Sequence, residues 1–142
     1  MMSYYELVTL LDKMIESPVS DEYINALNNA NVSLTKDRYL RFIEQVNYLL
    51  TKRLRNAMNK VIDLVCERYI EPNELVLELN NIRNEISYMQ KVVTCNLVKK
   101  DNQEIFLKSI IKNNNEIFTE IRSLYTDEEF FLVIDGYFIK EN

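Results

Sequence analysis

Several residue types are scarce or missing. The 142 residues include no histidine, no tryptophan and one glycine. Without histidine the chain lacks the commonest general base and metal ligand, and it can form no Ser-His or Cys-His nucleophile pair. A single glycine rules out Gly-rich loops that bind phosphate, and it leaves an all-β fold without residues for its tight turns. We therefore expect a protein that is not an enzyme and that binds no cofactor or metal.

Carboxylates are the remaining candidates for metal chemistry. Glu74 and Glu78 lie one helical turn apart, as do Glu116 and Glu120. Di-metal centres in helical bundles pair such glutamates with histidine and direct them into the core. These glutamates have no histidine and lie next to polar positions, so we expect them on solvated helix faces.

The two cysteines show no pairing pattern and are expected to be reduced core residues. If the chain reverses near residue 71, the two helices lie side by side and Cys95 lies 19 residues further from the turn than Cys66. At 1.5 Å per residue that is roughly 28 Å. This separation is far beyond disulfide reach.

Composition places the chain among globular proteins, with 47% hydrophobic and 27% charged residues. The length suits one domain, residues 1–142, without a linker. No apolar run is long enough to span a membrane, and the N-terminal segment carries acidic residues where a signal peptide would be basic or uncharged. We expect a cytoplasmic protein. Abundant Asn, Ile, Lys and Tyr are typical of an AT-rich genome, such as that of a phage, a virus or a mobile element, and for a virus the location would be the host cytoplasm.

Apolar residues recur at steps of three and four through most of the sequence, which predicts helices. Expected helices cover residues 3–16, a short segment after Ser20, about 35–70, about 72–98 and about 102–125. Pro72 suits the first position of a helix and separates the two longest ones. The fold class is therefore all-α, an elongated antiparallel bundle of five or six helices. Its centre is the hairpin of helices 35–70 and 72–98, with 102–125 as third core helix.

Polar residues indicate how some of these helices end. Lys99 and Lys100 are expected at the C-terminus of the second long helix, where positive charge favours the helix dipole. Asp101 is expected to cap the next helix together with Glu104. The run "NNN" at 113–115 is a predicted weak point in that helix.

The end of the chain, "TDEEFFLVIDGYFIKEN", admits two structures. Asp135-Gly136 between apolar runs is a hairpin signal, because both turn positions need positive φ. Thr126 and Glu129 instead have the spacing of a capping box, and Gly136 lies where a helix C-terminus favours glycine. We favour a helix over residues 127–135 that ends at Gly136 and is followed by an apolar tail.

Charge is distributed unevenly along the chain. Residues 34–70 carry eight basic and four acidic residues, whereas the segments on either side are acidic. One hypothesis is a contact to nucleic acid or to an acidic partner. The other, which we favour, is an internal match between this basic helix and the acidic helix that follows Pro72. The densest basic positions are Lys52, Arg53, Arg55 and Lys60.

Aromatic and apolar residues gather near the two ends of the chain. Such residues pack in cores, but they also form the hot spots of interfaces. With catalytic chemistry excluded, we expect the chain to bind another protein as a chaperone, inhibitor or scaffold subunit, and we do not expect nucleic acid as its main partner. Two alternatives stay open, a nucleic-acid-binding regulator and a homodimer formed through the N-terminal half of the long helix. The expected partner contacts are Phe130, Phe131, Tyr137, Phe138 and Ile139.

Overall fold

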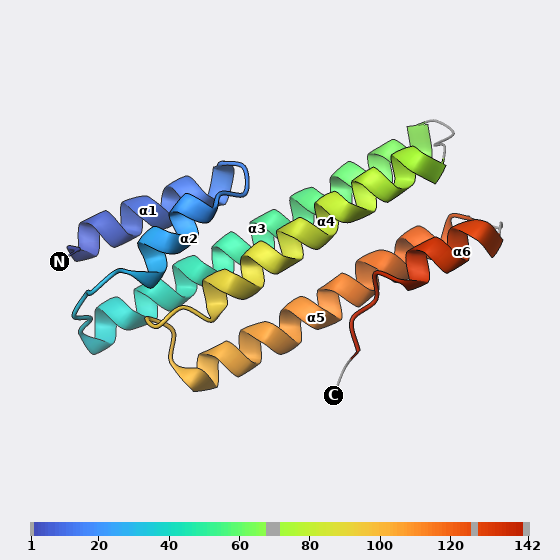
Figure 1. Ribbon diagram of the computed structural model, residues 1–142. Helices are drawn as coiled ribbons and strands as arrows, with labels where there is room; N and C mark the ends of the chain where they lie inside the picture. Colours follow the sequence, from blue (N-terminus) through green and yellow to red (C-terminus); the bar gives the residue numbers. More distant parts are fainter. Residues whose placement is uncertain (1, 68–71, 126–127, 141–142) are drawn as a thin grey trace.

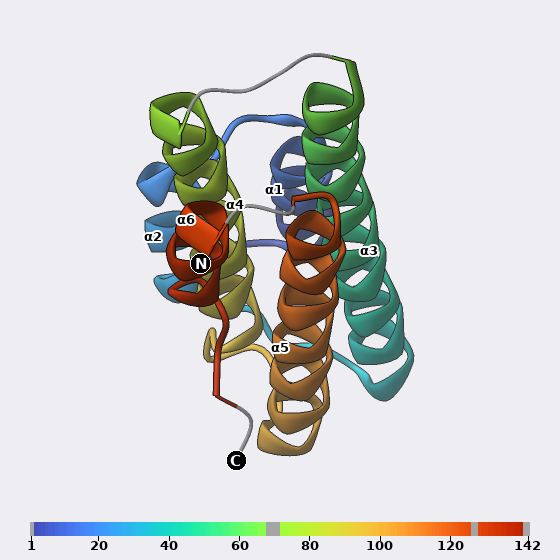
Figure 2. The ribbon, with the colours of Figure 1, turned by 90° about the vertical axis from the view of Figure 1, so that its right-hand side faces the viewer.

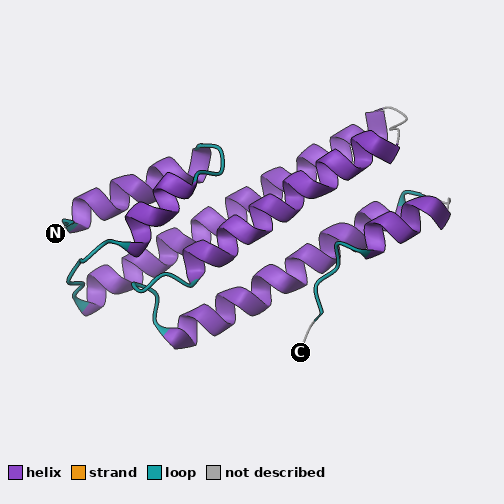
Figure 3. Cartoon of the chain, in the orientation of Figure 1, coloured by secondary structure: helices purple, strands orange, loops and turns teal. Residues whose placement is uncertain are grey.

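The chain folds into six helices in a computed structural model that describes residues 2–67, 72–125 and 128–140. No strand occurs among these residues (Figure 3). The predicted all-α class and antiparallel bundle are thus confirmed. The helices are α1 (Tyr4–Glu16), α2 (Asp21–Asn28), α3 (Lys36–Glu67), α4 (Pro72–Val93), α5 (Lys100–Ser123) and α6 (Glu128–Asp135).

The helices form three layers, with the α3–α4 hairpin in the middle (Figures 1 and 2). On one side α1 packs against α3 and α2 packs against α4. On the other side α5 contacts both α3 and α4, and α6 folds back onto α5 and α4. Because α1 runs along the N-terminal half of α3, one flank of the half proposed for homodimer formation is already covered.

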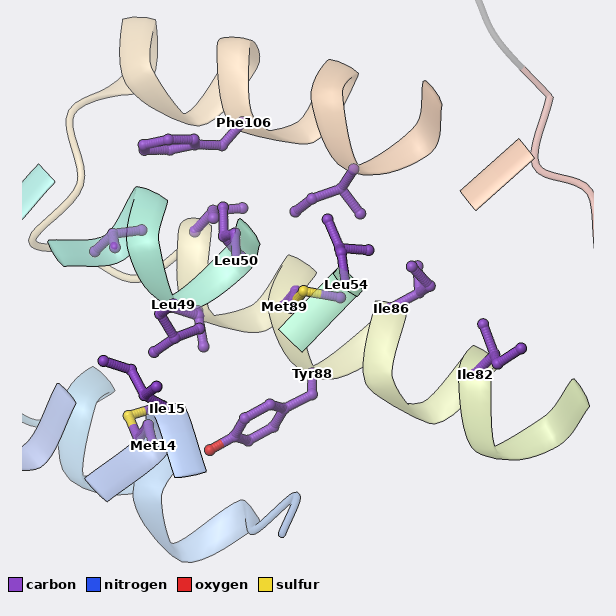
Figure 4. Packing of buried hydrophobic residues seen from close by; sticks show 14 of the residues in the cluster. Met14, Ile15, Leu49, Leu50, Leu54, Ile82, Ile86, Tyr88, Met89 and Phe106 are labelled. Atoms are coloured by element: carbon purple, nitrogen blue, oxygen red, sulfur yellow. The ribbon is translucent and has the colours of Figure 1, made fainter. Parts of the chain in front are cut away.

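Burial follows the helical periodicity of the sequence. The seam predicted for α4 is fully buried, at Leu75, Leu79, Ile82, Ile86, Met89 and Val93. On α3, Leu50 and Leu54 lie toward α5, while Leu49 lies toward α1 and α2 (Figure 4). The central hairpin is therefore apolar on two faces, which allows a layer of helices on each side of it.

The link between α4 and α5 differs from the prediction. α4 ends at Val93, five residues earlier than expected, and Cys95 and Val98 remain buried in the following turn. The Gln103 side chain donates to the carbonyls of both residues, at 3.3 and 2.9 Å. The apolar residues keep a helix-like spacing through this turn, and for that reason the sequence predicted a longer helix. Cys95 is a free buried thiol, and the side chain of Cys66 lies outside the described ones.

The start of α5 was also predicted wrongly. Lys99 is its N-cap and provides no side-chain hydrogen bond, so Lys99 and Lys100 lie at the N-terminus of α5 and not at the C-terminus of α4. Asp101 is in the first turn instead of capping it. The Lys99 N–H donates to the Tyr39 hydroxyl at 3.0 Å, and that hydroxyl donates to Asn102 at 2.6 Å. Tyr39 of α3 therefore supplies the hydrogen bonding at this end, where side-chain capping had been expected.

The C-terminal segment forms the expected helix, α6, and no hairpin. Gly136 follows it, but no glycine has positive φ, so this glycine does not end the helix through a left-handed conformation. The Thr126–Glu129 capping box lies outside the described residues. Beyond Gly136 the chain runs back along α5 as a non-helical tail (Figure 1).

The asparagine run was predicted to weaken α5, yet α5 continues through it and uses it to hold the tail. Asn114 is buried and donates to the Tyr137 carbonyl at 3.2 Å. Asn115 accepts from the Ile139 N–H at 2.9 Å and donates to the Ile139 carbonyl at 2.8 Å. Phe118, one turn further along α5, contacts the Tyr137 ring with a centroid separation of 5.5 Å. These contacts fix the tail across α5.

Asn115→Ala should release the tail. It removes both hydrogen bonds to Ile139, at a cost of about 1–3 kcal/mol in unfolding free energy. Hydrogen exchange of residues 136–140 should become faster while α3 and α4 keep their protection. Asn113→Ala is the matched control, because Asn113 reaches only Ser109 at 3.5 Å. Equal effects of the two substitutions would contradict the assigned role of Asn115.

Candidate functional site

A groove of about 640 Å³ opens on the α3–α4 hairpin where the α1–α2 layer ends. One wall is α3, the other is α4, and the connection between α1 and α2 closes one end. We call it the hairpin groove. Its lining comprises Ile15, Glu16, Ser17, Pro18, Val19, Lys52, Arg53, Asn56, Ala57, Lys60, Val61, Glu78, Asn81, Ile82, Asn84 and Glu85.

Helix lengths explain why the groove exists. α1 has 13 residues and α2 has 8, whereas α3 has 32 and α4 has 22. At 1.5 Å per residue α1 spans about 20 Å and α3 about 48 Å. The short α1–α2 hairpin therefore covers only part of one face of the long hairpin, and the rest of that face has no helix on it (Figure 1).

Arg53 forms the inner end of the groove. Its side chain is only 6% exposed, although it is charged. It binds Glu85 of α4 through two hydrogen bonds of 2.8 and 2.7 Å. The same guanidinium donates to the carbonyls of Met14 and Ser17 at the end of α1, each at 2.7 Å. One side chain thus joins α3, α4 and the C-terminus of α1.

The ring of Tyr88, on α4, packs against the guanidinium of Arg53. The Arg53 guanidinium is 5.0 Å from the centre of the Tyr88 ring, a cation–π contact within the core. The ring points from α4 toward Met14 and Ile15 (Figure 4). Its hydroxyl is buried and has no hydrogen-bond partner among the described residues. Burial raises the pKa of Tyr88 above the ordinary tyrosine value.

Most charges along the groove are neutralised within the molecule. Lys52 forms an ion pair with Glu16, and this hydrogen bond lowers the pKa of Glu16 and raises that of Lys52. Arg53 is paired with Glu85. Lys60 on α3 and Glu78 on α4 form no ion pair with each other or with another described residue. Among the described lining residues, the groove therefore has one unpaired cation, Lys60, on one wall and one unpaired carboxylate, Glu78, on the other.

The structure separates the four basic residues predicted as contacts. Lys52, Arg53 and Lys60 line the groove, but Arg55 does not. Arg55 is exposed two positions after Arg53, about 200° around the helix from it. Arg53 is buried and engaged with Glu85, so its side chain is not exposed for a contact to nucleic acid or an acidic partner. At this residue the structure shows the internal pairing with the acidic helix α4 that the second hypothesis predicts.

The aromatic residues predicted as partner contacts lie against the bundle. Phe130 is 5% exposed and stacks on Tyr125 at 4.5 Å, so it is not a surface contact. Phe131 is half-buried next to Arg122. The half-buried tail residues Tyr137, Phe138 and Ile139 pack against the core cluster. The Tyr137 hydroxyl donates to Asn80 at 2.7 Å, so the tail is tied to α4 as well as α5.

Sequence reasoning missed the groove asparagines. Asn56, Asn81 and Asn84 are exposed residues of its two walls. Polar positions on a helix have no periodic signal of their own, and their convergence depends on where the α1–α2 layer stops. The only available signal was the density of asparagine in "ELNNIRNE" at residues 78–85.

Comparison with protein-family models, with characterised protein sequences and with solved structures returns no match for this chain. None of the described helices combines the length and the apolar character needed to cross a membrane. Within the described part of the chain, no three acidic or cysteine side chains lie close enough together to hold a metal ion.

Arg53→Ala should lower the unfolding free energy by about 3 kcal/mol, because it leaves Glu85 and the carbonyls of Met14 and Ser17 without this donor. Arg53→Lys should recover only part of this, since an ammonium group lacks the planar fork. Urea denaturation measures the difference. Arg55→Ala is the control and should change stability by less than about 0.5 kcal/mol. Similar losses at both positions would show that Arg53 does not join the layers.

Tyr88→Phe should leave stability unchanged at pH 8 or raise it by up to about 1 kcal/mol, because an unpaired buried hydroxyl is costly. A raised pKa keeps Tyr88 protonated in the folded state when the unfolded chain would ionise. The stability gained from this difference in pKa is therefore fully present below the ordinary tyrosine pKa, about 10. It is lost as pH rises through the higher pKa of the folded state. Unfolding measured at pH 8 and above pH 10 should show a smaller alkaline loss for Tyr88→Phe. A marked destabilisation at pH 8 would indicate a hydrogen bond to this hydroxyl.

Proposed function

We propose that this protein acts without catalysis, by binding another protein in the hairpin groove. The observation that carries the proposal is the uncovered face of α3 and α4 beyond the α1–α2 layer. Its surface mixes apolar residues with unpaired polar groups, as binding sites do. The exposed Pro18 and Val19 and the half-buried Ala57 supply the apolar part, and Asn56, Asn81 and Asn84 the polar part. A chaperone, an inhibitor and a scaffold subunit all fit this mode of action.

The alternative of nucleic-acid binding has less support from the geometry. Of the residues assigned to it, Arg53 is buried and Arg55 lies on a different side of α3 from Lys60. The described lining of the groove has three carboxylates, Glu16, Glu78 and Glu85, against three cations, so it offers no excess positive charge to attract phosphate. A net charge of −5 adds unfavourable long-range interaction.

The aromatic tail and a homodimer are also weaker candidates than the groove. Contacts of Tyr137 and Ile139 with α4 and α5 occupy the groups that a partner would need. The exposed apolar residues of the N-terminal half of α3, Leu40 and Tyr48, are isolated ones, and α1 covers the neighbouring flank. Both alternatives place the partner on a surface other than the groove. A substitution in the groove should therefore weaken binding only if the proposal is correct.

Affinity purification from the native host tests the proposal with Asn81→Arg, which places a large side chain in the groove at an exposed position. We expect a host protein to be recovered stoichiometrically with the natural chain and about tenfold less with the variant. Asn47→Arg is the matched control, since Asn47 is exposed on α3 outside the groove. Both protein and nucleic acid in the eluate are identified.

Three results would count against the proposal. A protein recovered equally with both variants would bind a different surface. Nucleic acid recovered without protein would favour the regulator hypothesis. Light scattering that shows a dimer of the natural chain, disrupted by Asn81→Arg, would make the groove a contact between two copies of this chain.

A further inference from the structure

The C-terminal tail shows how this protein holds a non-helical segment against its helices. Asn115 makes one bond to the N–H and one to the carbonyl of Ile139, as a neighbouring strand would. Asn114 adds a bond to the Tyr137 carbonyl. Side-chain amides carried by a helix therefore satisfy peptide groups that have no strand beside them.

The hairpin groove presents the same chemical groups to solvent. Asn56 comes from α3, and Asn81 and Asn84 come from α4. None of the three amides makes a hydrogen bond to any residue in the described part of the chain. Each amide offers two donors and an acceptor oxygen with two lone pairs, which suits both the N–H and the carbonyl of a peptide unit.

Charge adds a second constraint, because Lys60 and Glu78 lie on opposite walls of the groove and are not paired with each other. Successive side chains of an extended peptide point to opposite sides. An acidic residue followed directly by a basic one would therefore direct a carboxylate to Lys60 and a cation to Glu78. Asn56, Asn81 and Asn84 lie further from the α3–α4 turn than Lys60 and Glu78, so the adjoining backbone of the same segment would lie over them.

We propose that the hairpin groove binds an extended segment of the partner protein that contains adjacent acidic and basic residues. This inference rests on the proposed function and specifies its ligand. A helical ligand fits less well, because a helix already pairs its own peptide groups and would cover the three amides without satisfying them. Pro18, Val19 and Ala57 supply apolar contact for the neighbouring side chains of the segment.

The test uses random linear peptides displayed on phage, selected on the full chain and counter-selected on Asn81→Arg. We expect recovered peptides to contain an adjacent acidic–basic pair and to lack helical periodicity. A synthetic copy should bind Lys60→Glu at least about tenfold more weakly and Asn84→Leu about three- to tenfold more weakly. Asn47→Leu, outside the groove, should leave its affinity unchanged.

Recovery of amphipathic helical peptides would overturn the inference, and so would peptides indifferent to Lys60→Glu and Asn84→Leu. Failure to recover any groove-dependent peptide would also overturn it. The proposed function is judged separately. If a host protein is captured by the natural chain and lost with Asn81→Arg while no extended peptide binds, the inference fails and the proposed function stands. If neither is captured, both fail.

Discussion

The buried Arg53 is the interaction on which the layered arrangement depends. A guanidinium removed from water needs a charged partner and further acceptors, and Glu85 with the carbonyls of Met14 and Ser17 supplies them. Those carbonyls belong to the end of α1, where helix geometry leaves acceptors unpaired and favours a positive charge. Arg53 thus fixes where α1 ends on the long hairpin. Since the groove begins where α1 ends, the same contact also determines the position of the groove.

The two layers beside the central hairpin use its faces differently. On the α5 side, α6 and the tail return along the helices, and Asn115 and Asn80 hold the tail in place. On the α1–α2 side none of the described segments returns, and the face near Lys60 and Glu78 stays open. In the described part of the chain, asparagine amides on one face bind the chain's own tail, whereas Asn56, Asn81 and Asn84 on the other face bind no described residue. For this reason we propose the groove, and not the aromatic tail, as the binding surface.

Much of the fold could be predicted because helix periodicity is local. The steps between Leu75 and Val93 placed α4 and its buried face, and Pro72 placed its beginning. The same periodicity placed the end of α4 too late, at Val98, because the buried turn after α4 has apolar residues at similar spacing. The candidate site was less predictable. The basic segment around Arg53 was visible, but its burial depends on partners that are distant in sequence. Met14 and Ser17 are 39 and 36 residues away, and Glu85 is 32 residues away. The groove asparagines had no sequence signal that distinguished them from other polar helix positions.

Hydrogen exchange of the full chain, alone and with the protein that co-purifies with it, tests the central claim most directly. The groove as binding surface predicts slower exchange on complex formation in three segments, residues 15–19, 56–61 and 78–85. Residues 136–140, already held by α4 and α5, should exchange at the same rate in both states. Protection confined to residues 128–140, with no change along the groove, would contradict the claim and return the binding surface to the aromatic end of the chain.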